Sequence, residues 1–135
     1  MTDNERRSLR SLEEVLHRIN ESVDDFASKP AKSASDKGAF EDYPLHKVAI
    51  WGDVDAAAVL LAHGAEINAA GEDGDTPLHR AFMAKVNKVK MIKFLLSRGA
   101  DPDVRNRYGE SPRDEATSLN DPEITRAMEL GRLRH

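Results

Sequence analysis

Several carboxylates in this chain could in principle take part in acid–base or metal chemistry, yet their spacing matches no catalytic or metal-binding motif. Asp73 and Asp75 stand close together, as paired acid–base groups do. Asp53 and Asp55 begin like a calcium loop, but the glycine and the terminal glutamate of that loop are missing. A phosphate-binding glycine loop, a nucleophile elbow and a His-Glu-x-x-His zinc pair are also absent from the sequence. We therefore expect no catalytic residue.

Histidine and cysteine, which bind many transition metals in proteins, offer no metal site either. Cysteine is absent, which excludes disulfides, thiolate nucleophiles and cysteine-based zinc sites. His17, His63 and His135 are scattered without the spacing of metal ligands. The sequence thus predicts neither a metal nor an organic cofactor.

The other two histidines, His46 and His79, belong to a motif that recurs along the chain. Tyr43-Pro44-Leu45-His46 returns 33 residues later as Thr76-Pro77-Leu78-His79, and in altered form as Ser111-Pro112-Arg113-Asp114. A leucine pair and a Gly-Ala pair follow the first two copies, at Leu60-Leu61, Gly64-Ala65, Leu95-Leu96 and Gly99-Ala100. Anchors that return in the same order identify an internal repeat of about 33 residues.

Each recurring residue type suits a particular place in a helix. Thr76 and Ser111 can cap a helix, and the proline after each fits the first helical position because no amide hydrogen bond is lost there. Gly64 and Gly99 suit left-handed helix ends. Apolar residues at helical spacing predict two short antiparallel helices in the second unit, at Leu78, Ala81 and Phe82 and at Val89, Ile92, Leu95 and Leu96.

The pattern resembles the ankyrin repeat family, whose Thr-Pro-Leu-His signature recurs at this period. The resemblance covers residues 42–131 and implies an all-α solenoid of about three helix-turn-helix units, at 42–74, 75–109 and 110–131, before a tail at 132–135. Hairpin-like fingers at Asp73-Gly74 and Tyr108-Gly109 would lead into the next unit. The units must stack, because one alone cannot bury its apolar face. In this family the signature histidine is structural, so we expect His46 and His79 to bridge turns by hydrogen bonds.

Two departures from the pattern concern the second and third units. From the proline to the glycine, the second unit is longer than the first by two residues near 84–86, which we expect to lengthen a surface loop. There Asn87 takes the place of Gly52 and tolerates the left-handed conformation. In the third unit Arg113 and Asp114 replace leucine and histidine, a polarity that suits a terminal repeat with one face in water. We expect the array to end with this unit.

Residues 1–41 precede the repeats and indicate an amphipathic helix followed by a linker. Ser11 with Glu14 matches a capping box, and apolar residues recur at intervals of three and four, so a helix over 9–26 is predicted. Residues 27–38 are small and polar and include a proline, which is typical of a linker. Three roles for the helix stay open: it covers the first repeat, pairs with a second copy, or docks into a groove of a partner. Its apolar positions are Leu9, Leu12, Leu16, Ile19, Val23 and Phe26.

Composition indicates one domain with unevenly distributed charge. The 135 residues are 39% hydrophobic and carry a formal net charge of −4. The sequence shows no membrane-spanning apolar run and no signal-peptide pattern, so we expect a soluble, cytoplasmic protein.

Residues 76–100 hold six basic residues and no acid, whereas 43–75 hold six acids and one lysine. We interpret the basic set as solvent-facing sides of helices rather than a nucleic-acid site, since the chain is acidic and poor in aromatic residues; it consists of Arg80, Lys85, Lys88, Lys90, Lys93 and Arg98.

The resemblance also indicates where a partner would bind. Ankyrin proteins usually bind partners on the finger tips and on the concave face of the first helices. Tryptophan and tyrosine often dominate binding energy, and acidic fingers would attract a basic partner. Trp51 has a second possible role, since it could pack under the N-terminal helix. The predicted partner-binding residues are Ile50, Trp51, Glu72, Asp73, Asp75, Met83, Arg107, Tyr108 and Glu110, with Ala84, Ser118 and Leu119 on the same surface.

We therefore expect a protein-binding module that is not an enzyme, is monomeric when free, and binds neither nucleic acid nor membrane. Short ankyrin proteins with a helical N-terminal extension resemble bacterial immunity proteins. The first hypothesis is accordingly an inhibitor that neutralises a cognate toxin, with the acidic finger and Trp51 against a basic toxin domain. The alternative is a regulatory adaptor that binds a cellular protein without inhibiting it.

Overall fold

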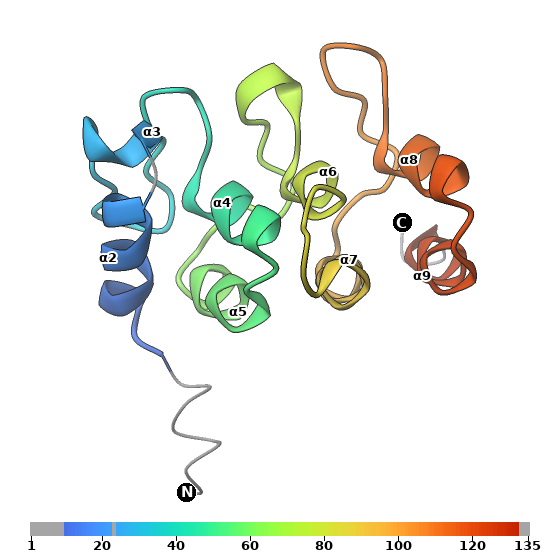
Figure 1. Ribbon diagram of the computed structural model, residues 1–135, viewed down its shortest axis with the longest axis horizontal. Helices are drawn as coiled ribbons and strands as arrows, with labels where there is room; N and C mark the ends of the chain where they lie inside the picture. Colours follow the sequence, from blue (N-terminus) through green and yellow to red (C-terminus); the bar gives the residue numbers. More distant parts are fainter. Residues whose placement is uncertain (1–9, 23, 133–135) are drawn as a thin grey trace, which may run out of the picture.

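The computed structural model describes residues 10–22 and 24–132, and this part of the chain consists of helices and loops without a strand. Three helix pairs stand side by side in two rows (Figure 1), the inner row of α4, α6 and α8 and the outer row of α5, α7 and α9. Two further helices precede them. The bounds are α2 Leu12–Ser22, α3 Asp24–Ala27, α4 Pro44–Trp51, α5 Val54–Ala62, α6 Pro77–Ala81, α7 Lys88–Ser97, α8 Pro112–Leu119 and α9 Pro122–Arg132, with a 3-10 turn, η1, at Glu72–Gly74. The predicted all-α solenoid is confirmed.

The helices of the repeat begin at the caps that the sequence predicts. Thr76 Oγ1 accepts a hydrogen bond from the His79 amide at 3.4 Å, and Ser111 Oγ accepts one from the Asp114 amide at 3.2 Å. A proline follows each cap as the first helical residue. Asn87, just before α7, is left-handed with φ 55°, as expected. The Thr76 and Ser111 side chains thus occupy amide donors that have no partner inside the helix.

A continuous apolar core fills the space between the two rows of helices. Leu45 of α4, Leu60 of α5, Leu78 of α6 and Leu95 of α7 are each at most 1% exposed. Burying a leucine side chain contributes about 1.5–3 kcal/mol. Because these residues come from successive units, the core exists only when the units stack.

The N-terminal helix packs against the first helix pair. Val15 and Ile19 of α2 and Phe26 of α3 are buried in the same core as Leu45. The expected single helix is divided into α2 and α3, while two of its predicted apolar positions, Leu9 and Val23, lie outside the described residues. Of the three roles considered, the structure shows this helix covering the first repeat.

The segment interpreted as a linker is packed on the array instead. Ala31 and Ala34 are 4% and 2% exposed, and the Asn20 side chain exchanges two hydrogen bonds with the Ala31 backbone, at 2.8 and 3.0 Å. The small residues of this segment resemble a linker in composition, but in the structure they allow it to pack closely beside α2. The segment then forms a finger before the first repeat.

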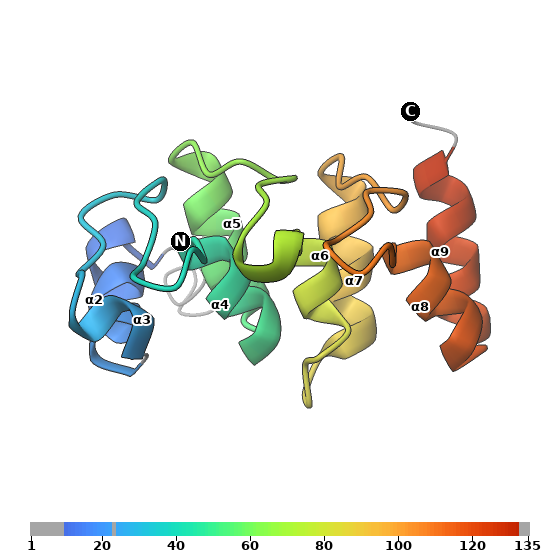
Figure 2. The same cartoon turned by 90° about the horizontal axis from the view of Figure 1, so that it is seen from above.

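Three fingers project on one side of the array (Figures 1 and 2). We name them finger 1 (38–42), finger 2 (71–75) and finger 3 (106–110). Each is closed by one backbone hydrogen bond from its first amide to its last carbonyl, at 2.8, 2.8 and 2.9 Å respectively. Finger 1 therefore repeats the geometry of the other two, although no Thr-Pro-Leu-His copy precedes it.

Candidate functional site

The two signature histidines tie each inner helix to a finger. His46 Nδ1 accepts the Tyr43 amide at 3.1 Å, and its Nε2 lies 2.8 Å from the carbonyl oxygen of Asp75 in finger 2. His79 Nε2 likewise lies 2.9 Å from the carbonyl of Glu110 in finger 3. Since Nδ1 of His46 accepts a hydrogen bond, Nε2 carries the ring hydrogen and donates a hydrogen bond to the Asp75 carbonyl. The predicted structural role of these histidines is confirmed.

The surroundings of the His46 ring favour its neutral form. Burial lowers the pKa of His46 below its ordinary value, and the nearby Asp42 carboxylate opposes this effect only in part. A protonated Nδ1 would also lose its bond from the Tyr43 amide. His46 therefore supports the fold rather than transferring protons.

A buried ionic network, which the sequence did not predict, lies at the base of fingers 1 and 2. Asp42 is fully buried, and its two carboxylate oxygens accept Arg80 NH1 and NH2 at 3.0 and 3.2 Å. Lys47 Nζ lies 3.1 Å from Asp42 Oδ2, and the Glu72 amide donates a hydrogen bond to Asp42 Oδ1 at 2.9 Å. Gly71 is required here because a Cβ on it would lie 2.4 Å from Asp42 Oδ1. The network joins the two fingers through side chains from distant parts of the sequence.

Arg80 was expected on the solvent-facing side of a helix, and that prediction is wrong. Its side chain is 9% exposed and donates from Nε to Asp75 at 3.0 Å, in addition to its bonds with Asp42. Helical spacing alone could not show that an acid 38 residues earlier in the chain faces this arginine. The other oxygen of Asp75 accepts Asn106 Nδ2 at 2.9 Å, so this predicted binding residue is engaged within the protein.

Fingers 2 and 3 are also joined near their tips. The Arg107 amide donates to the Asp73 carbonyl at 2.8 Å, and the Tyr108 hydroxyl lies 3.4 Å from Asp73 Oδ1. Arg107 NH1 is 3.7 Å from the same carboxylate oxygen. The structure thus brings together three of the predicted binding residues, while Glu72 and Glu110 are exposed beside them.

Trp51 lies apart from these finger tips, at the end of α4. It is half-buried against the core, and the Arg18 guanidinium of α2 covers its ring at 4.4 Å. Arg18 and Arg10 both bond to Asp53, at 2.5 and 2.7 Å. Of the two roles considered for Trp51, the contacts are those of packing under the N-terminal helix. Ile50 beside it is also half-buried.

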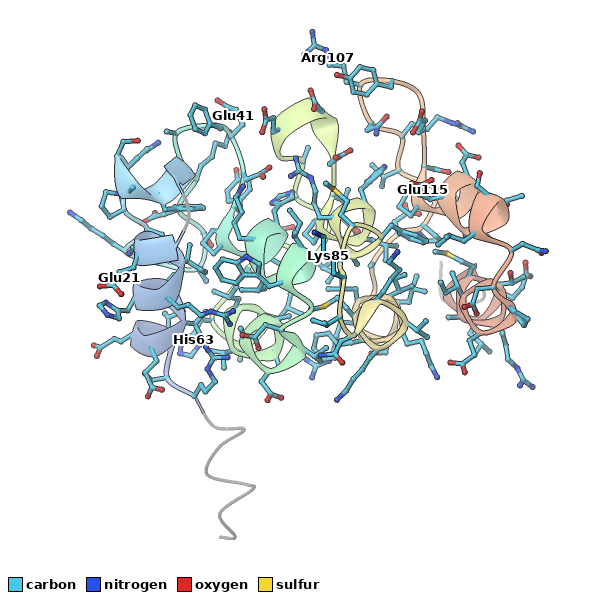
Figure 3. All side chains as sticks on the ribbon, in the orientation of Figure 1. Glu21, Glu41, His63, Lys85, Arg107 and Glu115 are labelled. Carbon is cyan, nitrogen blue, oxygen red and sulfur yellow. The ribbon has the colours of Figure 1, made fainter. Side chains whose placement is uncertain are left out.

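A second group of exposed residues lies just after α6 and at the end of α8. Met83 and Leu119 are 58% and 45% exposed, and Ser118 is exposed as well. Ala84 was expected on this surface but is 2% exposed, because the chain turns back after α6 with a bond from the Ala84 amide to the Ala81 carbonyl. Lys85 follows it in the lengthened loop, in front of the helix rows (Figure 3).

Two exposed apolar residues were not among the binding residues predicted from the sequence. Phe40, 54% exposed, stands in finger 1, and Val86, 61% exposed, stands in the loop after α6. Figure 3 shows Glu41, next to Phe40, and Arg107 at the tips of fingers 1 and 3. The Gly38 to Asp42 spacing, which matches Gly71 to Asp75, was the signal that could have revealed finger 1.

Neither a metal cluster nor a membrane-spanning helix occurs within the described residues. No group of three or more histidine, aspartate or glutamate side chains there could hold a metal ion. The helices between residues 10 and 132 that the structure describes are too short or too polar to cross a membrane.

Comparison with known proteins gives a family and several partial relatives. The family model for ankyrin repeats (3 copies) matches residues 13–106. Human protein phosphatase 1 regulatory subunit 27 is 34% identical over 86 residues, which cover 64% of this chain and 52% of that protein. An intracellular phospholipase A2 of Caenorhabditis elegans is 43% identical over 68 residues, or 48% of this chain and 6% of the relative. Human BCL-6 corepressor-like protein 1 is 35% identical over 74 residues, 55% of this chain and 4% of its own length. The matches thus span about half or less of these relatives.

Proposed function

Since this chain belongs to the ankyrin repeat family, a family of protein-binding modules, we propose that it acts as a regulatory adaptor that binds another protein through its three fingers. The adaptor has no catalytic role of its own. One relative is, by name, a regulatory subunit of a phosphatase, and others carry a similar stretch as a small part of a larger protein.

The observation that carries this proposal is a row of exposed aromatic and acidic side chains on braced fingers. Phe40 and Tyr108 are 54% and 66% exposed on fingers 1 and 3, and Glu72 and Asp73 lie on finger 2 between them. The Asp42 network and the Arg107–Asp73 bond hold the fingers in place before binding. A preorganised surface loses less conformational entropy on association, and exposed aromatics are frequent binding hot spots.

An inhibitor of the immunity type is the second candidate, and the acidic character of finger 2 favours it. Glu72, Asp73 and Glu110 would complement a basic face, such as that of a toxin domain. Asp75 contributes less to this surface because Arg80 and Asn106 already occupy its carboxylate. Trp51 is likewise engaged by Arg18.

Affinity purification of the tagged protein from its own cells, with mass spectrometry, tests the proposal. We expect a specific partner that is lost when Phe40 and Tyr108 are both changed to alanine, and retained with the control Thr125→Ala on the exposed side of α9. A partner that binds the double variant equally well would contradict the finger surface. The activity of the isolated partner then separates the candidates, since a toxin loses activity on binding and an adaptor's partner does not.

The proposal includes a cytoplasmic location and a monomeric state for the free protein. The N-terminal segment supports the second part, because Leu16, Ile19 and Phe26 of its apolar face are buried against the array and are not available to pair with another copy. Sedimentation equilibrium at micromolar concentration checks it.

A further inference from the structure

We propose that the outer helices α7 and α9 form a second protein-binding site, and that its occupant is an amphipathic helix with acidic flanks. The site lies in the outer row of helices, away from the fingers (Figure 1). It is therefore a surface separate from the one proposed above.

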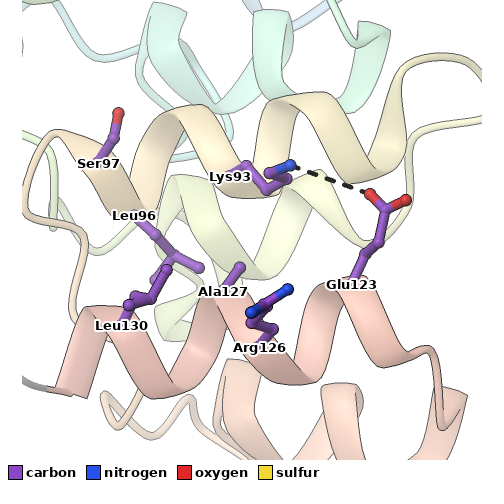
Figure 4. A pocket seen from close by; sticks show the side chains of 7 residues that line it. All are labelled: Lys93, Leu96, Ser97, Glu123, Arg126, Ala127 and Leu130. Atoms are coloured by element: carbon purple, nitrogen blue, oxygen red, sulfur yellow. Dashed lines mark ion pairs between the residues drawn. The ribbon is translucent and has the colours of Figure 1, made fainter.

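The groove between these helices has an apolar end and a charged end (Figure 4). Its volume is about 490 Å³, and at one end Leu96 of α7 and Leu130 of α9 point toward one another. At the other end Lys93 and Glu123 approach to 3.9 Å. Leu130 is 57% exposed, so its apolar surface is available to a ligand. The lining residues are Lys93, Leu96, Ser97, Glu123, Arg126, Ala127 and Leu130.

The groove continues along α7 beyond its charged end. A second hollow of about 310 Å³ shares Lys93 and Glu123 and extends to Val89 and Lys90. From Val89 to Ser97 the helix rises about 12 Å, at about 1.5 Å per residue. That length accommodates about two turns of a partner helix, and it is more than a compact small molecule would fill.

The charges along the groove favour an acidic occupant. Three cations, Lys90, Lys93 and Arg126, and one carboxylate, Glu123, line the two hollows, and Lys90 also lines a further hollow with Asp53 and Asp55. Within the part of the chain that the structure describes, Lys90 and Arg126 have no ion-pair partner. The pair of Lys93 with Glu123 is long and its side chains are 57% and 69% exposed, so it holds Lys93 only weakly.

A helix with leucines at every third or fourth position and glutamates beside them matches both features. Its leucines would cover the exposed Leu130, beside Leu96 and Ala127, which are only 3% and 8% exposed, and its carboxylates would reach Lys93 and Arg126. Binding would remove the exposed Leu130 from water while the cations gain partners.

Three synthetic peptides of about 16 residues, long enough to form a helix, test the proposal on the whole protein. The first has leucines at helical spacing flanked by glutamates, the second has lysines in place of the glutamates, and the third has glutamines in place of the leucines. We expect only the first to bind in fluorescence anisotropy titrations, and to shift the NMR amide signals of α7 and α9 but not those of the fingers. Equal binding of the lysine peptide, or shifts confined to the fingers, would overturn the proposal.

Matched variants locate the interaction. Lys93→Glu combined with Arg126→Glu should weaken the first peptide about tenfold, since two attractive charge pairs become repulsive. Glu123→Gln should strengthen it, whereas the exposed control Lys85→Glu, outside the groove, should leave it unchanged. Tyr108→Ala on finger 3 should also have no effect, which separates this site from the proposed finger surface.

A lipid ligand gives a different result. If the protein binds anionic phosphatidylglycerol vesicles but not the first peptide, and Leu130→Gln abolishes vesicle binding, the groove is a lipid-binding surface instead.

Discussion

Arg80 and Asp42 form a buried two-pronged ion pair between α6 and finger 1, although 38 residues of sequence separate them. Their donor–acceptor distances are 3.0 and 3.2 Å, and Arg80 also bonds to Asp75 and to the Glu72 carbonyl. One guanidinium therefore holds two neighbouring fingers. Because the proposed partner surface consists of these fingers, the pair links the interior of the protein to its recognition surface.

Removal of this guanidinium should destabilise the protein strongly. Arg80→Ala leaves the Asp42 carboxylate buried with Lys47 as its remaining cation, so we expect the free energy of unfolding to fall by about 3 kcal/mol. Urea denaturation measures this. The control Arg105→Ala removes a pair with Asp114 whose side chains are 65% and 54% exposed, and should cost less than about 1 kcal/mol. Similar losses in the two variants would contradict the assigned role of the buried pair.

Gly71 should tolerate no side chain. A Cβ there would lie 2.4 Å from Asp42 Oδ1 and 2.7 Å from His46 Nε2, so Gly71→Ala should displace both groups and cost more than about 2 kcal/mol. Gly64→Ala is the comparison, since its Cβ meets nothing within 4 Å. Its positive φ of 93° alone should cost about 1 kcal/mol. Thermal unfolding of the two variants checks the order; a smaller loss for Gly71→Ala would show that finger 2 can shift freely.

His46 should make stability depend on pH. Its pKa in the folded protein is lowered, so below the ordinary value of 6.5 the unfolded chain binds a proton that the folded chain does not. The contribution is therefore complete above pH 6.5 and is lost as the pH falls through the folded pKa. Urea midpoints measured from about pH 7.5 down to about pH 5 should decline less steeply in His46→Gln than in the parent protein.

The control for this prediction is His17→Gln. His17 is exposed on α2, with a side chain that is 72% accessible, so this variant removes a histidine without removing a buried contact. A parent and a His46→Gln variant with parallel pH profiles would mean that another group titrates.

Trp51→Ala should reduce stability more than binding. The indole packs on the core and beneath Arg18, so truncation should cost about 3 kcal/mol, as large aromatic-to-alanine changes in cores do. Partner affinity, measured well below the melting temperature, should stay within about twofold of the parent value, a change of about 0.4 kcal/mol. A large loss of affinity with unchanged stability would show that Trp51 contacts the partner.

Leu45→Ala and Leu78→Ala should be equally destabilising. The two side chains are 1% and 0% exposed, and α2 covers the first repeat much as a neighbouring unit covers the second. Core truncations of this type cost about 2–5 kcal/mol. A clearly smaller loss for Leu45→Ala in urea denaturation would show that the N-terminal helix packs loosely.

The repeat and the helix caps could be predicted from the sequence because their interactions are local, whereas the role of the histidines followed from the family resemblance, since His46 and His79 bond to carbonyls 29 and 31 residues further along the chain. Thr76 and His79 stand three residues apart, and the caps depend on that spacing alone. Finger 1 was missed because the loop that leads to it is built of small, polar residues that resemble a linker, although the Gly38 to Asp42 spacing matches that of finger 2.

The all-helical stack of repeats could thus be predicted from the sequence, because apolar spacing and capping act within a few residues along the chain. Which charged and aromatic residues form interior contacts, and which face solvent, became visible in the folded protein. Arg80 and Asp75 face inward and Trp51 lies under Arg18, whereas Phe40 on finger 1 and Leu130 on α9 stand exposed. A charged side chain is buried only when a partner from elsewhere in the chain satisfies its charge, and such partners meet only when the chain folds.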